Sequence, residues 1–173
     1  MDHAAPARMD VRFCFAGLLM TFGTTVFALE PVEEDVLLTV TGQISVTNAD
    51  GAAEFDLPQL LEIAPSRIET TTIWTDGLQT FEGVELADLM ALVGADGSAL
   101  RAVALNDYAV DIPIEDAVEG AALVAYLRNG APMSLRDKGP LWIVYPYDSS
   151  PEFQTEQIYS RSIWQLARIE VLP

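Results

Sequence analysis

Beyond residue 28 the chain contains no cysteine and no histidine, because Cys14 and His3 are the only residues of these types. No disulfide can therefore form within residues 29–173, and this segment offers neither a thiolate nor an imidazole. Soft-metal binding, thiol catalysis and histidine acid–base catalysis are excluded for it on these grounds. We expect the segment to be stabilised by a hydrophobic core alone, since a chain of this length buries roughly two thirds of the surface that it exposes when unfolded.

The first 28 residues are predicted to be a cleaved export signal. Arg8 and Arg12 give a positively charged start, residues 13–26 form an apolar run, and residues 26–28 resemble a signal-peptidase site. The apolar run is shorter than the ~20 residues of a membrane-spanning helix. A retained membrane anchor is the alternative. We expect residues 29–173 to form a single periplasmic domain, without a membrane span after cleavage.

The predicted domain is strongly acidic. The whole chain has 9 basic and 26 acidic side chains and a net charge of −17, and residues 1–28 contain equal numbers of each sign. Such a surface repels nucleic acid and anionic lipid, so neither is an expected partner. Solubility alone accounts for a charge of this kind, and its sign favours cationic or neutral partners.

Patterns typical of strands predominate, and an α+β, β-rich fold is predicted. Runs of β-branched residues or of alternating polarity predict strands, and one wholly apolar run is typical of a strand buried on both faces. The predicted strands cover residues 36–47, 53–55, 68–75, 100–112 (one bent strand or a pair), 121–127, 141–146 and 162–172. Turns are predicted at residues 48–51, 76–77, 106–107 and 129–130.

Two short helices are predicted between these strands. Asp56 is the expected N-cap of the first helix, which ends near Ala64. The apolar face of this helix is expected to contain Leu57, Leu60 and Leu61. The second helix is expected to end at Gly94, with a buried stripe of Leu86, Leu89, Met90 and Val93.

Several short motifs occur in an order that is found in a known family. They are Phe81–Leu86, Ala104–Tyr108 followed by Ile112-Pro113, Asn129-Gly130 and Lys138–Pro146. In this order the chain resembles the molybdopterin-binding domain of sulfite-oxidase-type oxidoreductases, from about Leu38 to Val171. From Trp74 onward it also resembles a small exported branch of that family, including the segment Tyr159–Leu166. The resemblance implies mixed sheets with short helices and a cofactor loop that follows a strand.

The chain departs from this family at the positions that hold the cofactor. The family ligates molybdenum through a cysteine in the loop after the strand that here is Thr70–Trp74, and no cysteine is present there. The nearby hydroxyl groups belong to threonines, which are hard ligands. Trp142 stands where the family has an arginine. We therefore expect no cofactor, with molybdopterin as the alternative, because a fold does not by itself carry a function.

Eight residues are candidate ligand-binding positions, and none is expected to be catalytic or to bind a metal. Basic residues around the predicted 129–130 turn and before the last strand are suited to a carboxylate or a phosphate. Aromatic and polar residues beside two other turns are suited to the mouth of a pocket. The candidates are Trp74, Asn106, Asp107, Tyr108, Arg128, Arg136, Lys138 and Arg161. The alternative for the bases is pairing with the surface acids Asp137, Asp148, Glu152 and Glu156.

These expectations combine into one hypothesis and one alternative. The hypothesis is an exported, non-catalytic module with a molybdopterin-oxidoreductase-like fold. It would bind a small anionic or aromatic ligand, or a protein partner, in the periplasm. The alternative is a molybdopterin-dependent oxidoreductase, or its cofactor-binding subunit, with a ligand other than cysteine.

Overall fold

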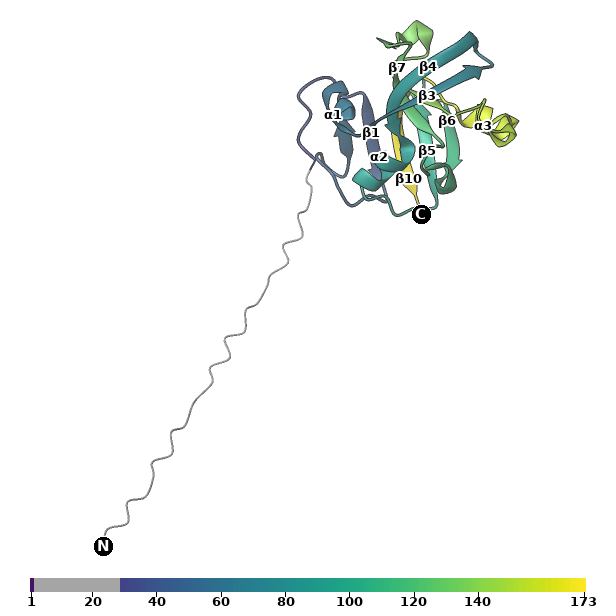
Figure 1. Cartoon of the computed structure of the whole chain (residues 1–173). Coiled ribbons are helices and arrows are strands. Elements are labelled where there is room, and N and C mark those ends of the chain that lie inside the picture. Colours follow the sequence, from purple (N-terminus) through teal and green to yellow (C-terminus); the bar gives the residue numbers. More distant parts are fainter. Residues whose placement is uncertain (2–28) are drawn as a thin grey trace.

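Two five-stranded sheets enclose the core of the chain, in a computed structural model that describes Met1 and residues 29–173 (Figure 1). The strands are β1 (Leu38–Gly42), β2 (Ala53–Phe55), β3 (Pro65–Thr72), β4 (Thr75–Glu85), β5 (Ala99–Ala104), β6 (Ala109–Pro113), β7 (Leu123–Arg128), β8 (Ala131–Pro132), β9 (Trp142–Val144) and β10 (Leu166–Leu172). The helices are α1 (Leu57–Glu62), α2 (Leu86–Leu92) and α3 (Glu156–Arg161), with 3-10 turns η1 (Ile114–Asp116), η2 (Leu135–Asp137) and η3 (Pro151–Phe153). The predicted β-rich α+β fold is confirmed.

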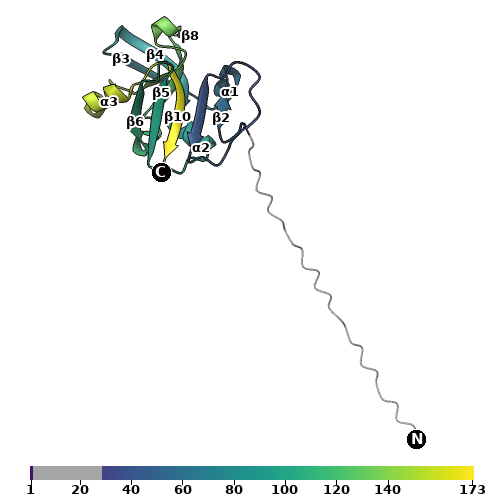
Figure 2. The same ribbon diagram turned by 180° about the vertical axis from the view of Figure 1, so that it is seen from behind.

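The first sheet has the strand order β2-β1-β10-β5-β6, and β10 lies in its middle (Figure 2). Its β1–β10 pair is parallel, whereas β1–β2, β10–β5 and β5–β6 are antiparallel. In the second sheet β3, β4 and β7 are antiparallel neighbours, and β8 and β9 both pair with β7. The first sheet is therefore mixed, because it contains the parallel pair β1–β10.

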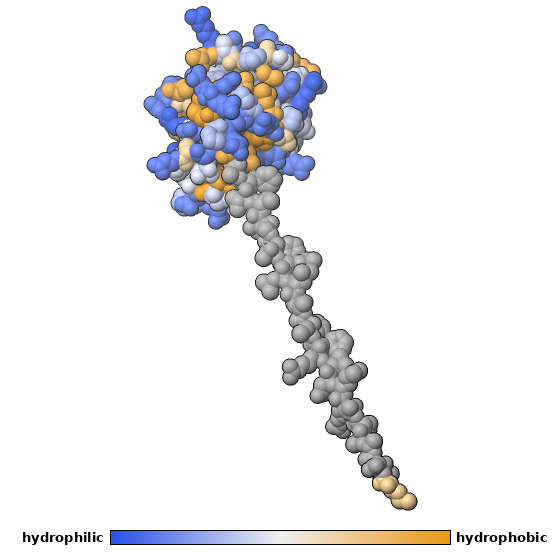
Figure 3. All heavy atoms as spheres, turned by 90° about the vertical axis from the view of Figure 1, so that its left-hand side faces the viewer, coloured by the Kyte–Doolittle hydropathy of each residue, from blue (hydrophilic) through white to orange (hydrophobic). Residues whose placement is uncertain are grey.

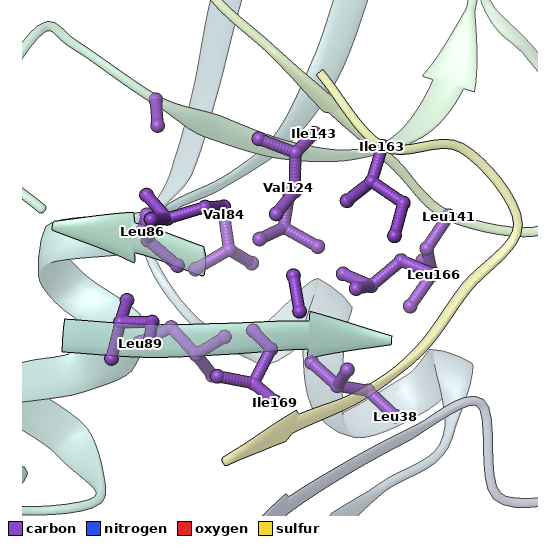
Figure 4. Packing of buried hydrophobic residues seen from close by; sticks show 14 of the residues in the cluster. Leu38, Val84, Leu86, Leu89, Val124, Leu141, Ile143, Ile163, Leu166 and Ile169 are labelled. Carbon is purple, nitrogen blue, oxygen red and sulfur yellow. The ribbon is translucent and has the colours of Figure 1, made fainter. Parts of the chain in front are cut away.

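The core lies between the two sheets and is wholly apolar at its centre (Figure 4). Val124 and Ile143 of the second sheet are 0% exposed, as is Leu166 at the start of β10. Burial of each such side chain stabilises the fold by roughly 1.5–3 kcal/mol. Trp142, Ile143 and Val144 are all fully buried, so the prediction that this segment is buried on both faces is confirmed. Hydrophilic residues cover most of the outer face seen in Figure 3.

Both predicted helices are present. Asp56 caps α1, since its carboxylate accepts a hydrogen bond from the backbone N–H of Gln59 (3.0 Å). The Gln59 N–H, and then those of Glu33 and Glu34, lower the pKa of Asp56. Leu60 is buried, but Leu61 is 48% exposed, so its predicted place on the apolar face is wrong. The predicted stripe of α2 is confirmed, because its residues are all buried: Leu86, Leu89, Met90 and Val93.

The strand boundaries differ from the prediction in three places. The predicted strand 36–47 is confined to β1, because the chain leaves the sheet at Gly42, whose φ is +89°. The predicted break at residues 76–77 is wrong. The chain turns at residues 73–74, and Asp76 and Gly77 lie inside β4. The last strand was predicted to begin at residue 162, but β10 begins at Leu166.

Helix α3 was not predicted. Its N-cap is Thr155, whose hydroxyl accepts a hydrogen bond from the N–H of Ile158 (3.3 Å), and Glu156 lies in its first turn. These two residues are the sequence signal that identifies the helix. The predicted export signal lies outside the described residues, apart from Met1. Within residues 29–173 no helix has both the length and the apolar character that a membrane crossing requires.

Candidate functional site

Trp74 lies at the turn between β3 and β4, between two depressions of the surface. The turn is closed by Thr72, whose hydroxyl accepts from the Trp74 N–H (3.1 Å) and lies 2.8 Å from the Thr75 hydroxyl. The half-buried Trp74 ring makes edge contacts with four aromatic rings at centroid distances of 5.7–6.1 Å. These rings belong to Trp142, Tyr147, Tyr159 and Trp164.

The first depression, which we call the basic depression, has a volume of about 310 Å³. It is lined by Trp74, Thr75, Asp76, Gln79, Arg128, Arg136, Asp137 and Lys138. The lining therefore contains three basic and two acidic side chains on a chain whose net charge is −17. Of the predicted site residues, the structure brings Trp74 and the three bases together here.

Local structure positions these bases. Arg128 ends β7, and the predicted turn follows it, with positive φ at Asn129 (53°) and Gly130 (76°). The Asn129 amide fastens this turn to β4, because its oxygen accepts from the Thr80 N–H (3.0 Å) and its nitrogen donates to Gln79 (2.9 Å). The turn is thus a fixed platform for Arg128.

Lys138 lies after η2 in the left-handed backbone region, with φ 76°. A non-glycine residue in this conformation costs about 1–2 kcal/mol. The Lys138 ammonium lies 5.2 Å from the ring centroid of Trp164 and 5.6 Å from that of Trp142. Such cation–π contacts hold the charge at the edge of the depression without neutralising it.

Ion pairing separates these three bases from the other bases of the described segment. Arg67, Arg101, Arg161 and Arg168 each pair with a carboxylate, at 2.5–3.1 Å. Within residues 29–173 no ion pair is formed by Arg128, Arg136 or Lys138. The alternative of pairing with Asp137, Asp148, Glu152 or Glu156 therefore does not describe them.

Arg161, the fourth basic candidate, does not line the basic depression. Its guanidinium lies 3.1 Å from the carboxylate of Asp116, which also accepts a hydrogen bond from the Tyr145 hydroxyl (2.8 Å). Arg161 ends the helix α3 that the sequence did not predict, and the helix carries it toward η1. Burial, followed by the Asp116 charge, raises the pKa of Tyr145, so this phenol stays neutral and structural.

The second depression, which we call the aromatic pocket, has a volume of about 370 Å³. It lies where the β3–β4 turn, the β5–β6 turn and the α3 region meet. It is lined by Trp74, Ala104, Asn106, Tyr108, Tyr159, Ser160, Ser162, Ile163 and Trp164. Tyr108 is 56% exposed and Trp164 is 39% exposed, so both rings are accessible at its rim.

The structure brings Asn106 and Tyr108 to this pocket with Trp74, but not Asp107. The Asp107 backbone is left-handed (φ 63°), and its carboxylate pairs with Arg168 at 2.7 Å. The lining residues of the α3 region were not predicted as site residues. Their only sequence signal was the density of aromatic residues in the second half of the chain.

The floor behind the aromatic pocket is neutral. The Tyr147 hydroxyl donates to the Ser162 hydroxyl (2.7 Å), which in turn donates to the Ile158 carbonyl (2.8 Å). Burial raises the pKa of Tyr147 to about 12, although the hydrogen bond between Tyr147 and Ser162 opposes this. Near neutral pH the buried phenol therefore stays protonated and does not act as a base.

The threonines of β3 are committed to structural hydrogen bonds. The Thr70 hydroxyl accepts from the Asp148 N–H (3.1 Å), and the Thr71 hydroxyl donates to the Asp148 carboxylate (2.7 Å). The Thr71 N–H and hydroxyl lower the pKa of Asp148. Thr72 closes the Trp74 turn as described above. Among the described residues no group of three or more Cys, His, Asp or Glu side chains is arranged to hold a metal ion.

Comparison with models of protein families gives a match. The model of the family described as oxidoreductase molybdopterin binding domain matches residues 56–149, more than half of the chain. A search of curated proteins found no match. The matched segment contains the whole basic depression and the β5–β6 turn, but the α3 region that completes the aromatic pocket lies beyond it.

Proposed function

The chain belongs to the oxidoreductase molybdopterin-binding domain family, and from this premise we propose that it is an exported, non-catalytic member that binds a small anionic ligand in the basic depression. The observation that carries the proposal is the convergence of Arg128, Arg136 and Lys138, three bases without a carboxylate partner among the described residues. In a chain of net charge −17, unpaired bases gathered at one place are the groups that bind an anion.

The residues at the cofactor position do not fit molybdopterin. The hydroxyls of Thr70, Thr71 and Thr72 are used in hydrogen bonds that hold β3 and the Trp74 turn. Trp142, where the family has an arginine, is 0% exposed, and its indole N–H donates to the Ser162 carbonyl (3.1 Å). The protein therefore lacks, at these positions, both a soft ligand and a cation for the phosphate of the cofactor.

The ligand that the basic depression favours is small and carries a carboxylate or a phosphate. The two guanidinium groups offer planar pairs of N–H donors that match such oxygens, and the Lys138 ammonium adds a point charge. Gln79 and Thr75 supply neutral hydrogen-bonding groups in the same lining. Asp76 and Asp137 oppose a highly charged ligand, because they leave the lining with a small positive excess.

Titration calorimetry with inorganic phosphate and with acetate tests this proposal. Arg136→Gln is expected to weaken phosphate binding about tenfold, since a hydrogen bond to a charged group is worth about 1.5–3 kcal/mol. Arg101→Gln is the matched control, because Arg101 of β5 is also exposed but pairs with Asp111 of β6. Equal weakening in both variants, or no phosphate or acetate binding by the unaltered protein, would contradict the proposal.

Family membership itself favours a second candidate function, a molybdopterin-dependent oxidoreductase or a cofactor-binding subunit with a ligand other than cysteine. Elemental analysis of the protein purified from its native compartment, with a fluorescence assay for released pterin, separates the two. We expect neither molybdenum nor tungsten, and no pterin. Stoichiometric metal together with pterin would establish the second function.

Export is the part of the proposal that rests on residues 1–28. The basic start, the apolar run and the small residue Ala28 support cleavage after residue 28. Mass spectrometry of the protein from the periplasmic fraction is expected to find Leu29 as its first residue. An intact N-terminus in the membrane fraction would instead identify a retained anchor.

A further inference from the structure

We propose that the aromatic pocket binds an organic cation of the quaternary ammonium type. This site is separate from the basic depression and would take a ligand of the opposite charge. The proposal is carried by the geometry of the aromatic rings, by the neutrality of the lining, and by the acidity of the chain around it.

Aromatic rings form the walls of the pocket. The Trp74 ring lies 5.8 Å from both Tyr159 and Trp164, at interplanar angles of 88° and 72°. Nearly perpendicular rings form adjacent walls, and Tyr108 lines the same pocket from the β5–β6 turn. Clustered Trp and Tyr rings of this kind bind quaternary ammonium groups, because their electron-rich faces attract a cation that cannot donate hydrogen bonds.

The lining contains no residue with a formal charge. Its polar members are Asn106, Ser160 and Ser162, besides the phenol groups. The Ser162 hydroxyl is already used between Tyr147 and Ile158, so it makes no demand for a ligand hydrogen bond. A pocket without its own carboxylate suits a bulky, weakly hydrated cation better than a primary ammonium group, which requires acceptors when it is desolvated.

The net charge of the whole chain has the sign that attracts such a ligand, although the Lys138 ammonium lies 5.2 Å from the Trp164 ring and opposes it locally. The chain carries a net charge of −17, and Asp107 stands between the lining residues Asn106 and Tyr108. The Asp107 side chain remains 82% exposed although it pairs with Arg168. A negative field of this kind raises the local concentration of cations, and salt weakens it.

A neutral ligand of the same shape is the physical alternative, because the lining is largely apolar. Choline and its uncharged isostere 3,3-dimethyl-1-butanol distinguish the two, since they differ in the charge on the branched group. Titration of each, followed by calorimetry and by tryptophan fluorescence, is expected to show choline binding at least about tenfold more tightly. Equal affinities for the two ligands, or no binding of choline, would overturn the proposal on the unaltered protein alone.

Substitutions at the exposed rim test the walls without disturbing the core. Tyr108→Leu should reduce choline affinity several-fold, whereas Tyr108→Phe, which keeps the ring, should retain most of it. Leu78→Ala is the matched control, because Leu78 is exposed to a similar degree (63%, against 56% for Tyr108) but does not line the pocket. A loss in Tyr108→Phe equal to that in Tyr108→Leu would assign the effect to the hydroxyl and overturn the cation–π basis.

This inference and the anion-binding proposal fail separately. Arg136→Gln is expected to weaken phosphate binding and leave choline affinity unchanged, because Arg136 does not line the aromatic pocket. A loss of choline binding in this variant would indicate that choline binds in the basic depression, and it would contradict the proposal. Circular dichroism of every variant excludes a change of fold as the cause.

Discussion

The basic depression and the aromatic pocket lie on either side of the same tryptophan but are built in different ways. The bases of the first come from the single stretch 128–138. The lining of the second comes from the β3–β4 turn, the β5–β6 turn and the α3 region, which are far apart in the sequence. The bases of one site are therefore close in the sequence, although the β3–β4 turn and β4 complete its lining, whereas the other site is assembled from three distant segments.

The two proposed sites of this acidic chain therefore differ in the chemistry of their linings. Charge is concentrated in the basic depression, where bases without carboxylate partners in the described part lie beside Asp76 and Asp137. The aromatic pocket contains ring faces and neutral polar groups. Trp74 lines both sites, so its replacement is expected to affect both of them.

Trp74→Ala is expected to have the largest effect. The change removes four ring contacts and leaves a gap over Trp142, so it should lower the free energy of unfolding by about 3 kcal/mol. Urea denaturation measures this loss. Both ligands should also bind more weakly, whereas Trp164→Ala, at a 39% exposed ring, should cost less stability. Weaker binding of only one ligand would show that the two sites do not share this wall.

Lys138→Gly is expected to separate stability from binding. Glycine adopts the left-handed conformation of residue 138 without strain, so the free energy of unfolding should rise by about 1 kcal/mol. Phosphate should nevertheless bind more weakly, because a base is removed from the lining. Thermal denaturation and calorimetry on the same preparation measure the two effects. A destabilised variant would mean that the lysine contacts with Trp142 and Trp164 outweigh its backbone strain.

Acid should loosen the turn that carries Trp74 through Asp148. The pKa of Asp148 is lower in the folded protein than in the unfolded chain, so its stabilising effect is present above about pH 4 and is lost as the pH falls through the folded value. Asp148→Asn should therefore be less stable than the unaltered protein at pH 6, and the two should converge at low pH. Urea denaturation across this range measures the effect.

A second variant checks the cause of this pH dependence. Thr71→Val removes the hydroxyl donor to Asp148 but keeps the Thr71 backbone N–H, which is the larger cause of the lowered pKa. The pH dependence of stability should shrink in part. A full loss in Thr71→Val would assign the effect to the hydroxyl alone.

Lys138→Gln is expected to have the smallest effect and to sharpen the comparison between the sites. Its ammonium lies over Trp164, a wall of the aromatic pocket, and repels a second cation near that ring. Removal of this charge should strengthen choline binding about two- to threefold, a change of roughly 0.5 kcal/mol across a screened distance. Calorimetry at low salt detects it. Weaker choline binding would indicate that Lys138 supports the wall by packing.

The sequence predicted the bases of the basic depression better than the lining of the aromatic pocket. Asn129-Gly130 is a strong turn signal, and it correctly brought Arg128, Arg136 and Lys138 together before the structure was known. The predicted turn beside Trp74, at residues 76–77, was wrong, because Trp74 itself lies in the turn at residues 73–74. Threonine hydroxyls close that turn, and local propensity does not report such a contact.

The lining of the aromatic pocket could be predicted from the sequence only in part. Asn106 and Tyr108 were predicted because they flank a turn, but the contribution of Trp164 depends on helix α3. The apolar alternation of the last segment favoured a strand from residue 162, and the short cap at Thr155 was too weak a signal to oppose it. Arg161 was misplaced for the same reason, because helix α3, which was not predicted, directs this side chain toward Asp116.

The middle position of β10 has a consequence for when the chain can fold. Before residues 166–172 are synthesised, β1–β2 and β5–β6 are two separate hairpins, and β1 and β5 lack the neighbour that β10 later provides. Isolated two-stranded hairpins are marginally stable in water. The first sheet can therefore be completed only after β10 has left the ribosome. If the chain is exported, as we propose, this sheet stays open until its last strand is available.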